Sequence, residues 1–196
     1  MKKIVPSDAI LIPDNAELKY QGVIFRVYNW PQQVFNGSEE TFEMLKRTDT
    51  VVALAIVEDK LLLLEDEQPH KGLKLKLPGG QVDPKDDSTL AAVKREVKEE
   101  TGYDFNSWKL IKVTQPHNEM EWFVYLYLAW DPGEKTELNL DAGEKIRVRQ
   151  VSLEEYKNLV DFKKNILTEN YDTISKINSL DELKNMSEYT GQEVER

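Results

Sequence analysis

Apolar and polar positions along the middle of the chain define a set of strands. Residues Thr50–Val57 (TVVALAIV) form an almost continuous apolar run, which is typical of a buried strand. A polar triplet at 58–60 turns the chain into a second apolar run, Leu61–Leu64, so the pattern predicts a β-hairpin. Further along, Trp108–Thr114 and Trp122–Trp130 have the β-branched and aromatic content of strands. Together these segments predict one sheet.

A single helix is predicted between the two pairs of strands. Asp87 or Ser88 can cap its N-terminus, it runs to about Thr101, and Gly102 supplies its C-terminal stop. Apolar residues at i, i+3 and i+7 give it one buried face: Leu90, Val93 and Val97. The preceding segment 68–76 is predicted as a polar loop or short strand, and residues 77–80 (LPGG) cannot be helical.

The C-terminal third contains short elements with clear start signals. An acidic loop at 134–143 leads into a predicted strand, Lys145–Val151. Ser152-Leu153-Glu154-Glu155 is a capping box that opens a helix, and Ser179-Leu180-Asp181-Glu182 opens another. The last eight or so residues are polar, and we expect them to be frayed. Strands on both sides of a helix indicate the α/β (α+β) class.

The first 46 residues read as a β-rich extension ahead of the main domain. Gly22–Trp30 and Gln32–Phe35 are strand-like, Pro31 separates them, and Asn36-Gly37 is a turn signal. We therefore expect an extension at 1–46, a main domain at 47–162, and C-terminal helices with a polar tail at 163–196.

Charge and composition narrow the possible partners. The chain has 36 acidic and 26 basic residues and a formal net charge of -10, which disfavours bulk nucleic acid and anionic membranes as partners. Its lack of cysteine excludes disulfides, thiolate zinc sites and a cysteine nucleophile. The longest apolar runs, 51–57 and 123–130, are too short to span a bilayer, and Pro6 interrupts any secretory leader. We expect a cytoplasmic protein that reaches a phosphate-bearing substrate through cations.

Three carboxylates on the predicted helix indicate metal chemistry. Glu96 lies three residues before Glu99 and four before Glu100, so all three converge on one edge and repel one another. Arg95 can pair with Glu99, which leaves the other two uncompensated. A Glu-rich helix is usually a solvated face, but a hard divalent cation resolves the repulsion, and carboxylates are the ligands that magnesium and manganese prefer.

A glycine pair precedes the helix and completes the pattern. Without Cβ atoms, Gly79 and Gly80 can bring backbone groups close to a metal or a phosphate, and a loop carbonyl can complete a coordination shell. Taken alone, Gly-Gly is most often a turn. The fixed spacing from the glycines through Arg-Glu to Glu-Glu-x-Gly-aromatic has few accidental explanations.

Residues 95–103 (REVKEETGY) resemble the second half of the Nudix box, whose pattern is Arg-Glu-aliphatic-x-Glu-Glu-x-Gly-hydrophobic. Tyr103 stands where an aliphatic residue is commoner, Gly80 corresponds to the opening glycine, and Asp87 corresponds to the next acidic position. The interval from Gly80 to Asp87 is one residue longer than in the family pattern. The resemblance implies a Nudix fold, a mixed β-sheet sandwiched between helices, over about residues 46–162.

The resemblance also implies the chemistry of a Nudix hydrolase. Glu96, Glu99 and Glu100, with a carbonyl of Gly79 or Gly80, would bind two or three Mg²⁺ or Mn²⁺ ions, and Arg95 would orient a carboxylate. The metals would neutralise a diphosphate and lower the pKa of a bound water, which attacks one phosphorus.

Two further features resemble the branch that hydrolyses ADP-ribose and nucleotide sugars. The first is the β-rich extension, which in that branch supports a homodimer and helps build the base pocket. The second is the acidic segment after the box, where that branch carries a late catalytic glutamate that matches Glu144. The general base could be Glu144, Asp141 or a helix glutamate.

Candidate substrate contacts come from the aromatic residues and one histidine. Tyr28, Trp30 and Trp122 could stack on a purine, although aromatic residues in strands are more often core. His117 follows the strand after the box and is a candidate substrate contact.

Three other functions fit less of the pattern. A nucleoside triphosphate or dinucleoside polyphosphate substrate would keep the chemistry. A Nudix domain that binds a nucleotide without cleaving it would typically have lost box carboxylates. An acidic interaction domain leaves the spacing from Gly-Gly to Glu-Glu unexplained.

Overall fold

The structure is a computed structural model that describes residues 2–69, 72–140, 145–159 and 174–195. The strands are β1 (Lys2–Val5), β2 (Glu17–Gln21), β3 (Arg26–Gln33), β4 (Glu39–Lys46), β5 (Thr50–Val57), β6 (Lys60–Gln68), β7 (Gly72–Lys76), β8 (Gly79–Gln81), β9 (Tyr103–Thr114), β10 (Met120–Glu121), β11 (Val124–Lys135), β12 (Lys145–Val151) and β13 (Gln192–Glu195). The described helices are α1 (Thr89–Thr101), α2 (Leu153–Leu159) and α4 (Leu180–Lys184).

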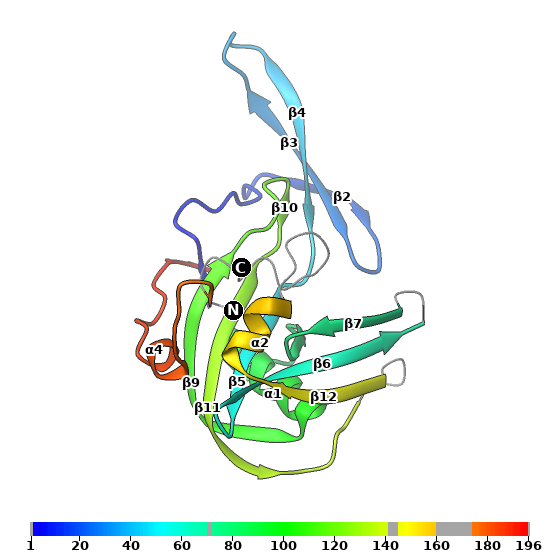
Figure 1. The fold of residues 1–196 in the computed structure, drawn as a ribbon. Coiled ribbons are helices and arrows are strands. Elements are labelled where there is room, and N and C mark those ends of the chain that lie inside the picture. Colours follow the sequence, from blue (N-terminus) through cyan, green and yellow to red (C-terminus); the bar gives the residue numbers. More distant parts are fainter. Residues whose placement is uncertain (1, 70–71, 141–144, 160–173, 196) are drawn as a thin grey trace.

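The body of the molecule is a mixed seven-stranded sheet. Its main path runs β12-β6-β5-β11-β9, with β7 paired to β6 and β8 paired to β5. The central pair β5–β11 is parallel, with Val51 beside Tyr125, whereas the other pairs are antiparallel. In Figure 1 this sheet forms the lower part of the molecule.

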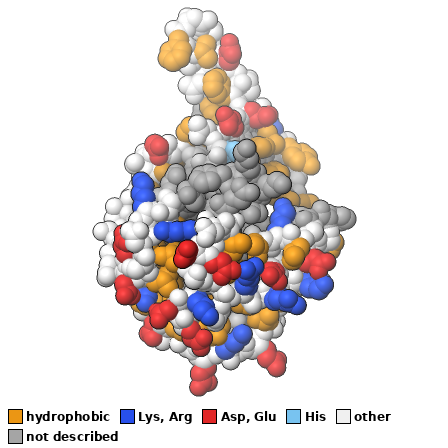
Figure 2. All heavy atoms as spheres, viewed as in Figure 1, with side chains coloured by type: hydrophobic (Ala, Val, Ile, Leu, Met, Phe, Trp, Pro, Cys, Tyr) orange, Lys and Arg blue, Asp and Glu red, His pale blue; other side chains and the backbone are white. Residues whose placement is uncertain are grey.

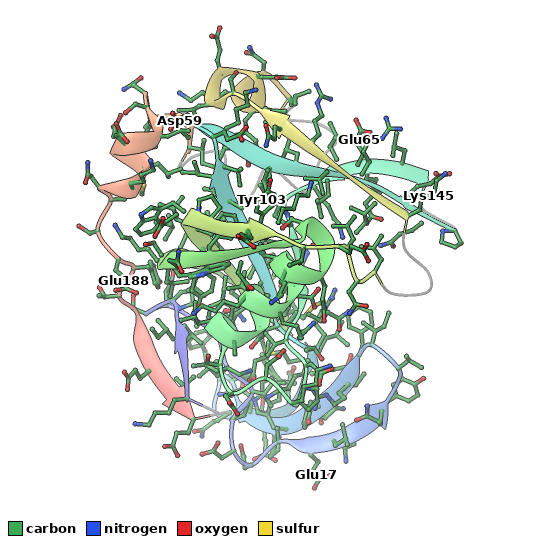
Figure 3. The ribbon with its side chains drawn as sticks, turned by 90° about the horizontal axis from the view of Figure 1, so that it is seen from below. Glu17, Asp59, Glu65, Tyr103, Lys145 and Glu188 are labelled. Carbon is green, nitrogen blue, oxygen red and sulfur yellow. The ribbon has the colours of Figure 1, made fainter. Side chains whose placement is uncertain are left out.

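Alternation along the central strands builds two apolar layers, one on each face of the sheet. Val51, Ala53 and Ala55 of β5 face α1, where they pack with Val93 and Val97. The intervening residues of β5 face the other way and pack against α2 and α4, in a cluster that includes Leu54, Ile56, Tyr156 and Leu183. Figure 3 shows α1 lying across one face of the sheet. The predicted fold class, a mixed sheet between helices, is confirmed.

Helix α1 begins and ends where its sequence signals predicted. The hydroxyl of Ser88 accepts a hydrogen bond from the N–H of Ala91 at 3.0 Å, which satisfies a donor at the helix N-terminus. Gly102 closes the helix with φ 76°, and its N–H donates to the carbonyl of Lys98. Ser88, rather than Asp87, is therefore the N-cap.

Several other local signals are also confirmed. The β5–β6 hairpin turns at Glu58 and Asp59, both with positive φ. The hydroxyls of Ser152 and Ser179 accept N–H bonds at the starts of α2 and α4. Strands β9 and β11 are longer than predicted because they continue as one antiparallel ribbon through an irregular register as far as Lys135.

The extension departs from its predicted strands. A four-stranded sheet, β10-β4-β3-β2, rises above the body in Figure 1. Pro31 does not separate two strands as predicted but lies inside β3, opposite Thr41 of β4. Strand β2 pairs with β3 only as far as Asn29, so one side of β3 is open at the proline, which has no N–H to donate. The Asn36-Gly37 turn joins β3 to β4, a strand that the sequence analysis missed.

The expectation of a frayed tail is wrong. Residues Gln192–Glu195 form β13, which pairs antiparallel with β1, so that Val5 lies opposite Gln192. The pairing brings Val5 into the main core, where it is fully buried. Polar composition concealed this strand because its partner lies at the other end of the sequence. The division of the chain at residues 46 and 162 stays a prediction.

Candidate active site

The glycine pair lies in a strand rather than in a free loop. Strand β8 pairs with β5, which places Gly79 beside Val52 and Gly80 beside Val51. Gly79 has φ +145°, and a Cβ there would lie 2.1 Å from the carbonyl oxygen of Val51, so only glycine fits. A Cβ on Gly80 would lie 2.4 Å from the carboxyl carbon of Glu96. The glycines therefore let the backbone of β8 contact the acidic edge of α1.

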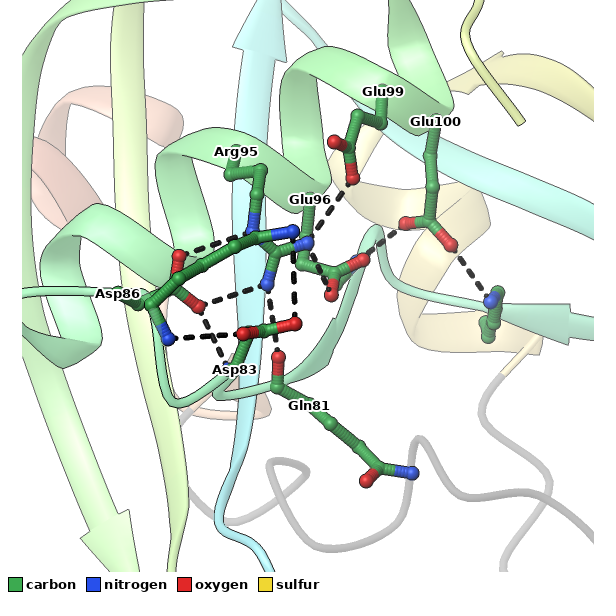
Figure 4. Close-up of polar contacts among 10 residues, drawn as sticks. Gln81, Asp83, Asp86, Arg95, Glu96, Glu99 and Glu100 are labelled. Atoms are coloured by element: carbon green, nitrogen blue, oxygen red, sulfur yellow. Dashed lines mark hydrogen bonds and ion pairs between the residues drawn. The ribbon is translucent and has the colours of Figure 1, made fainter. Parts of the chain in front are cut away.

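Arg95 is the centre of a charged network on that edge (Figure 4). Its Nε and Nη2 donate to the two oxygens of Asp86 at 3.0 and 2.9 Å. Its Nη1 donates to Glu96 at 2.9 Å and to Glu99 at 3.1 Å, and Nη2 also reaches the carbonyl of Gln81 at 3.1 Å. One guanidinium thus ties the loop after β8 to two helix carboxylates.

This network corrects two expectations. Arg95 pairs with Glu96 as well as with Glu99, so Glu96 is not left uncompensated. Asp86, which is buried, takes the acidic position that the sequence assigned to the exposed Asp87. The hydrogen bond from Arg95 lowers the pKa of Asp86 below its ordinary value, and the same bond raises the pKa of Arg95.

Glu100 is held by a second cation that the sequence analysis missed. Its side chain is buried, with Oε1 accepting from Nζ of Lys76 at 2.8 Å and Oε2 accepting from the N–H of Gly79 at 2.6 Å. Lys76 also lies 3.1 Å from Oδ2 of the buried Asp66. Burial raises the pKa of Glu100 to about 7, although Lys76 and Gly79 act in the opposite direction. The expectation that Glu100 is uncompensated is therefore wrong.

A polar cavity opens beside these groups. Its volume is about 530 Å³, and its lining includes Gly80, Gln81, Lys76, Arg95, Glu96 and Glu99. Carboxylates of the helix, the cationic side chains of Lys76 and Arg95, and backbone of β8 thus border one space that is large enough for a small molecule. Glu100 lies behind this lining, against Gly79.

The donor set suits divalent cations, although it is not yet arranged around one. In the described residues, no three acidic or histidine side chains already form a metal cage. The helix carboxylates instead bond to the cationic groups of Arg95 and Lys76. Their oxygens are hard ligands. Because Gly80 has no Cβ, its backbone lies close to the Glu96 carboxylate, so a backbone carbonyl can join the same coordination shell. By the chemistry of their oxygens Glu96, Glu99, Glu100 and Gly80 could hold magnesium or manganese, and their role as metal ligands stays a prediction.

The aromatic candidates divide into two groups. His117 and Trp122 stack with their ring centroids 6.3 Å apart, and the guanidinium of Arg47 lies 4.6 Å from the centre of the Trp122 ring. Trp30 lies on β3 and contacts Phe42, with ring centroids 6.2 Å apart. Tyr28 lies on the same strand, opposite Met44.

None of the four predicted contacts, Tyr28, Trp30, His117 and Trp122, is in the described lining of the cavity, so their role in substrate binding stays a prediction. Glu144 and Asp141 lie outside the described residues.

The whole arrangement, a mixed sheet with a glycine strand against an acidic helix, agrees with the comparison to known families. The NUDIX domain model matches residues 46–169, and the chain belongs to this family. Nudix hydrolases generally use divalent cations such as Mg²⁺. No curated protein matches the chain. No helix in the described part of the chain is long and apolar enough to cross a membrane.

Solved structures extend the likeness beyond the family match. The crystal structure of an ADP compounds hydrolase is 22% identical, covers 87% of this chain and 95% of its own, and has a TM-score of 0.66. A NUDIX hydrolase from Nitrosomonas europaea is 26% identical, covers 68% and 93%, and has a TM-score of 0.52. In fold and family, the protein is a Nudix hydrolase.

Proposed function

We propose that the protein hydrolyses the diphosphate bond of a nucleoside diphosphate derivative, ADP-ribose or a nucleotide sugar, to a nucleoside monophosphate and a sugar phosphate. The observation that carries the proposal is the meeting of Glu96, Glu99 and Arg95 with the glycine strand at one polar cavity. A diphosphate needs positive charge beside it. The cationic side chains that line this cavity, Lys76, Lys85 and Arg95, are already paired with carboxylates, so bound cations would supply that charge.

Each residue of the helix edge has a role in this proposal. Glu96, Glu99 and Glu100, with the carbonyl of Gly80, would hold two or three Mg²⁺ or Mn²⁺ ions. When bound, these ions supply charge neutralisation and a water of lowered pKa. Arg95 orients Glu96 and Glu99 and is itself fixed by Asp86. The residue that accepts the proton of the attacking water is Glu144, Asp141 or a helix glutamate.

The substrate class is supported by the extent of the structural likeness. The ADP compounds hydrolase covers more of the chain than residues 46–169 account for, so its likeness includes parts outside the family match. In our proposal Tyr28, Trp30, His117 and Trp122 contribute to binding of the base, and Gly79 contributes to binding of the diphosphate.

We also propose a homodimer formed through the extension. Its strands carry large apolar side chains at the surface, and Leu18, Tyr20 and Phe42 are exposed at 50%, 62% and 44%. Figure 2 shows apolar side chains along the arm that projects from the body. A surface of this kind is typical of a protein–protein contact.

The test is a hydrolysis screen with Mg²⁺ that offers ADP-ribose, nucleotide sugars, dinucleotides and triphosphates, with a chelator control. We expect metal-dependent release of a nucleoside monophosphate from one diphosphate compound. Glu96→Gln should abolish this release. The same substitution at Glu154, which is exposed, is the control and should leave the release unchanged. Cleavage of triphosphates alone would reassign the substrate. Binding of a compound without cleavage of any would indicate a nucleotide sensor instead.

A further inference from the structure

Lys76 occupies a position that the charge pattern of the helix does not explain. It ends β7, and its ammonium lies between two buried carboxylates, 2.8 Å from Oε1 of Glu100 and 3.1 Å from Oδ2 of Asp66. The side chains of Lys76, Asp66 and Glu100 are exposed at only 22%, 7% and 3%. The ion pairs are therefore poorly screened by solvent.

The strand register fixes this contact. Leu64 lies opposite Lys76 and Asp66 lies opposite Lys74, so Asp66 is the diagonal neighbour of Lys76 on the same face of β6 and β7. Leu62, two residues before Leu64 on β6, lies on the same face and belongs to the cluster around α1. This face of β6 and β7 is therefore directed toward the helix. The sheet therefore positions the Lys76 ammonium beside Glu100, whereas Arg95 contacts its partners from the helix itself.

Asp66 retains a site that a displaced ammonium could use. Its Oδ2 already accepts from Gln68 at 3.0 Å, whereas its Oδ1 is buried and has no hydrogen-bond partner among the described residues. A buried acceptor without a donor is costly. A small movement of the Lys76 ammonium away from Glu100 and toward Oδ1 would satisfy it.

We propose that Lys76 is a resident counter-cation that holds Glu100 in the metal-free protein, and that a divalent cation binding at Glu100 displaces its ammonium to Asp66. The inference rests on the proposed function, because it assumes that Glu100 is a metal ligand. Lys76 is then a positioning residue that sets how tightly the site binds metal. It keeps the buried carboxylate of Glu100 oriented by Gly79 and ready for the cation.

The direct test is Mn²⁺ binding without substrate, followed through the electron paramagnetic resonance signal of free Mn²⁺. Lys76→Met removes the competing charge at similar volume and should bind Mn²⁺ about tenfold more tightly, the equivalent of one lost charged hydrogen bond. Lys76→Arg keeps a competing charge and should stay near the wild type. Lys74→Met is the matched control, because Lys74 is exposed two residues away on the same strand. Unchanged or weaker binding by folded Lys76→Met would overturn the proposal.

A second background separates competition at Glu100 from general electrostatics. In Glu100→Gln the ammonium has no carboxylate to share with the metal, so adding Lys76→Met should leave Mn²⁺ affinity within about twofold. A tenfold gain that persists in this background would show that Lys76 acts only as a nearby positive charge, and would overturn the competition.

A measurement on the wild type covers the case in which Lys76→Met fails to fold. In protein with ¹⁵N-labelled lysine side chains, the Lys76 ammonium signal, assigned with Lys76→Arg, should shift as Mg²⁺ saturates the site. An unchanged signal at saturation, or a wild type that binds neither Mg²⁺ nor Mn²⁺, contradicts the proposal. None of these titrations contains substrate, so a protein that binds Mn²⁺ and cleaves nothing fails only the proposed function.

Discussion

The body and the extension of this protein use apolar side chains in opposite ways. In the body, both faces of the sheet are covered by the chain's own helices, and residues such as Leu62 and Val97 are fully buried. In the extension, strands of similar length leave Leu18, Tyr20 and Phe42 about half exposed. The body therefore fixes the acidic edge of α1 by internal packing, whereas the extension presents a surface that its own chain does not cover.

The boundary between the two regions is polar. The buried carboxylate of Glu121 accepts the N–H of Ile12 at 2.8 Å and also pairs with Lys46. Nearby, buried Asp49 accepts from Lys3 at 2.6 Å and from the N–H of Phe123 at 3.0 Å. Directional contacts of this kind help to fix the position of the extension, whose first strand also packs into the main core through Val5.

The same truncation should have very different effects in the two regions. Leu62→Ala creates a cavity beside α1 and should lower the free energy of unfolding by about 2–5 kcal/mol. Leu18→Ala, in the extension, should lower it by less than about 0.5 kcal/mol because the side chain is half exposed. Denaturant titration of both variants measures the difference. Equal losses would show that the extension packs as tightly as the body.

Within the body, a methyl group added at the glycine strand should affect catalysis rather than folding. Gly80→Ala places a Cβ against the carboxylate of Glu96 and should lower kcat about a hundredfold, the effect expected when a reacting group is misplaced by about 1 Å. Gly133→Ala is the control, because a Cβ there would meet nothing closer than 3.7 Å. If Gly80→Ala keeps full activity, the assignment of Glu96 to the active site is wrong.

Asp86 should matter for stability more than its exposed neighbour. Asp86→Asn weakens the bidentate pair with Arg95 and should lower the free energy of unfolding by about 1–2 kcal/mol at neutral pH, whereas Asp87→Asn should not. The Arg95 bond lowers the pKa of folded Asp86, so this stability is present above the ordinary aspartate pKa and is lost as the pH falls through the folded value. The difference from the wild type should therefore shrink in acid. A pH-independent difference would contradict this origin.

The smallest effect on stability is expected at the surface of the extension. Phe42→Ser should change the free energy of unfolding by less than about 0.5 kcal/mol. It should nevertheless shift a dimer toward monomer in sedimentation experiments, because it removes apolar area from the proposed contact. Thr136→Ser, remote in sequence and on the body, serves as the control. A wild type that sediments as a monomer at all concentrations would refute the homodimer.

Sequence signals that act locally predicted the structure well. Ser88 and Gly102 delimit α1 through bonds to residues within four positions, and the β5–β6 turn needs only Glu58 and Asp59. Strand β13 was missed because its polar residues gain order only from β1, at the other end of the sequence. Strand β4 was missed because its residues are mostly polar and exposed, although its partner β3 directly precedes it. No periodicity within either segment reports such pairing.

In the candidate site, too, contacts set by local spacing were predicted and contacts set by the fold were not. The helix spacing brought Glu96, Glu99 and Arg95 together as the sequence suggested. The acidic position of the box was matched to Asp87, in a loop that is one residue longer than the family pattern. That loop folds into a turn in which Asp83 and Asp86 bond to each other, which directs Asp86 toward Arg95. Lys76 was not foreseen because its contact depends on the register of β6 and β7.

The pairing of β1 with β13 has a consequence for synthesis of the protein on the ribosome. Val5 emerges long before Gln192, its neighbour in the sheet. Domains generally begin to fold while their chains are still being made. Here the core cluster that contains Val5 and packs against α1 cannot be completed until β13 has been translated. A nascent chain stalled after α2 should therefore leave β1 unpaired and open to capture by a chaperone.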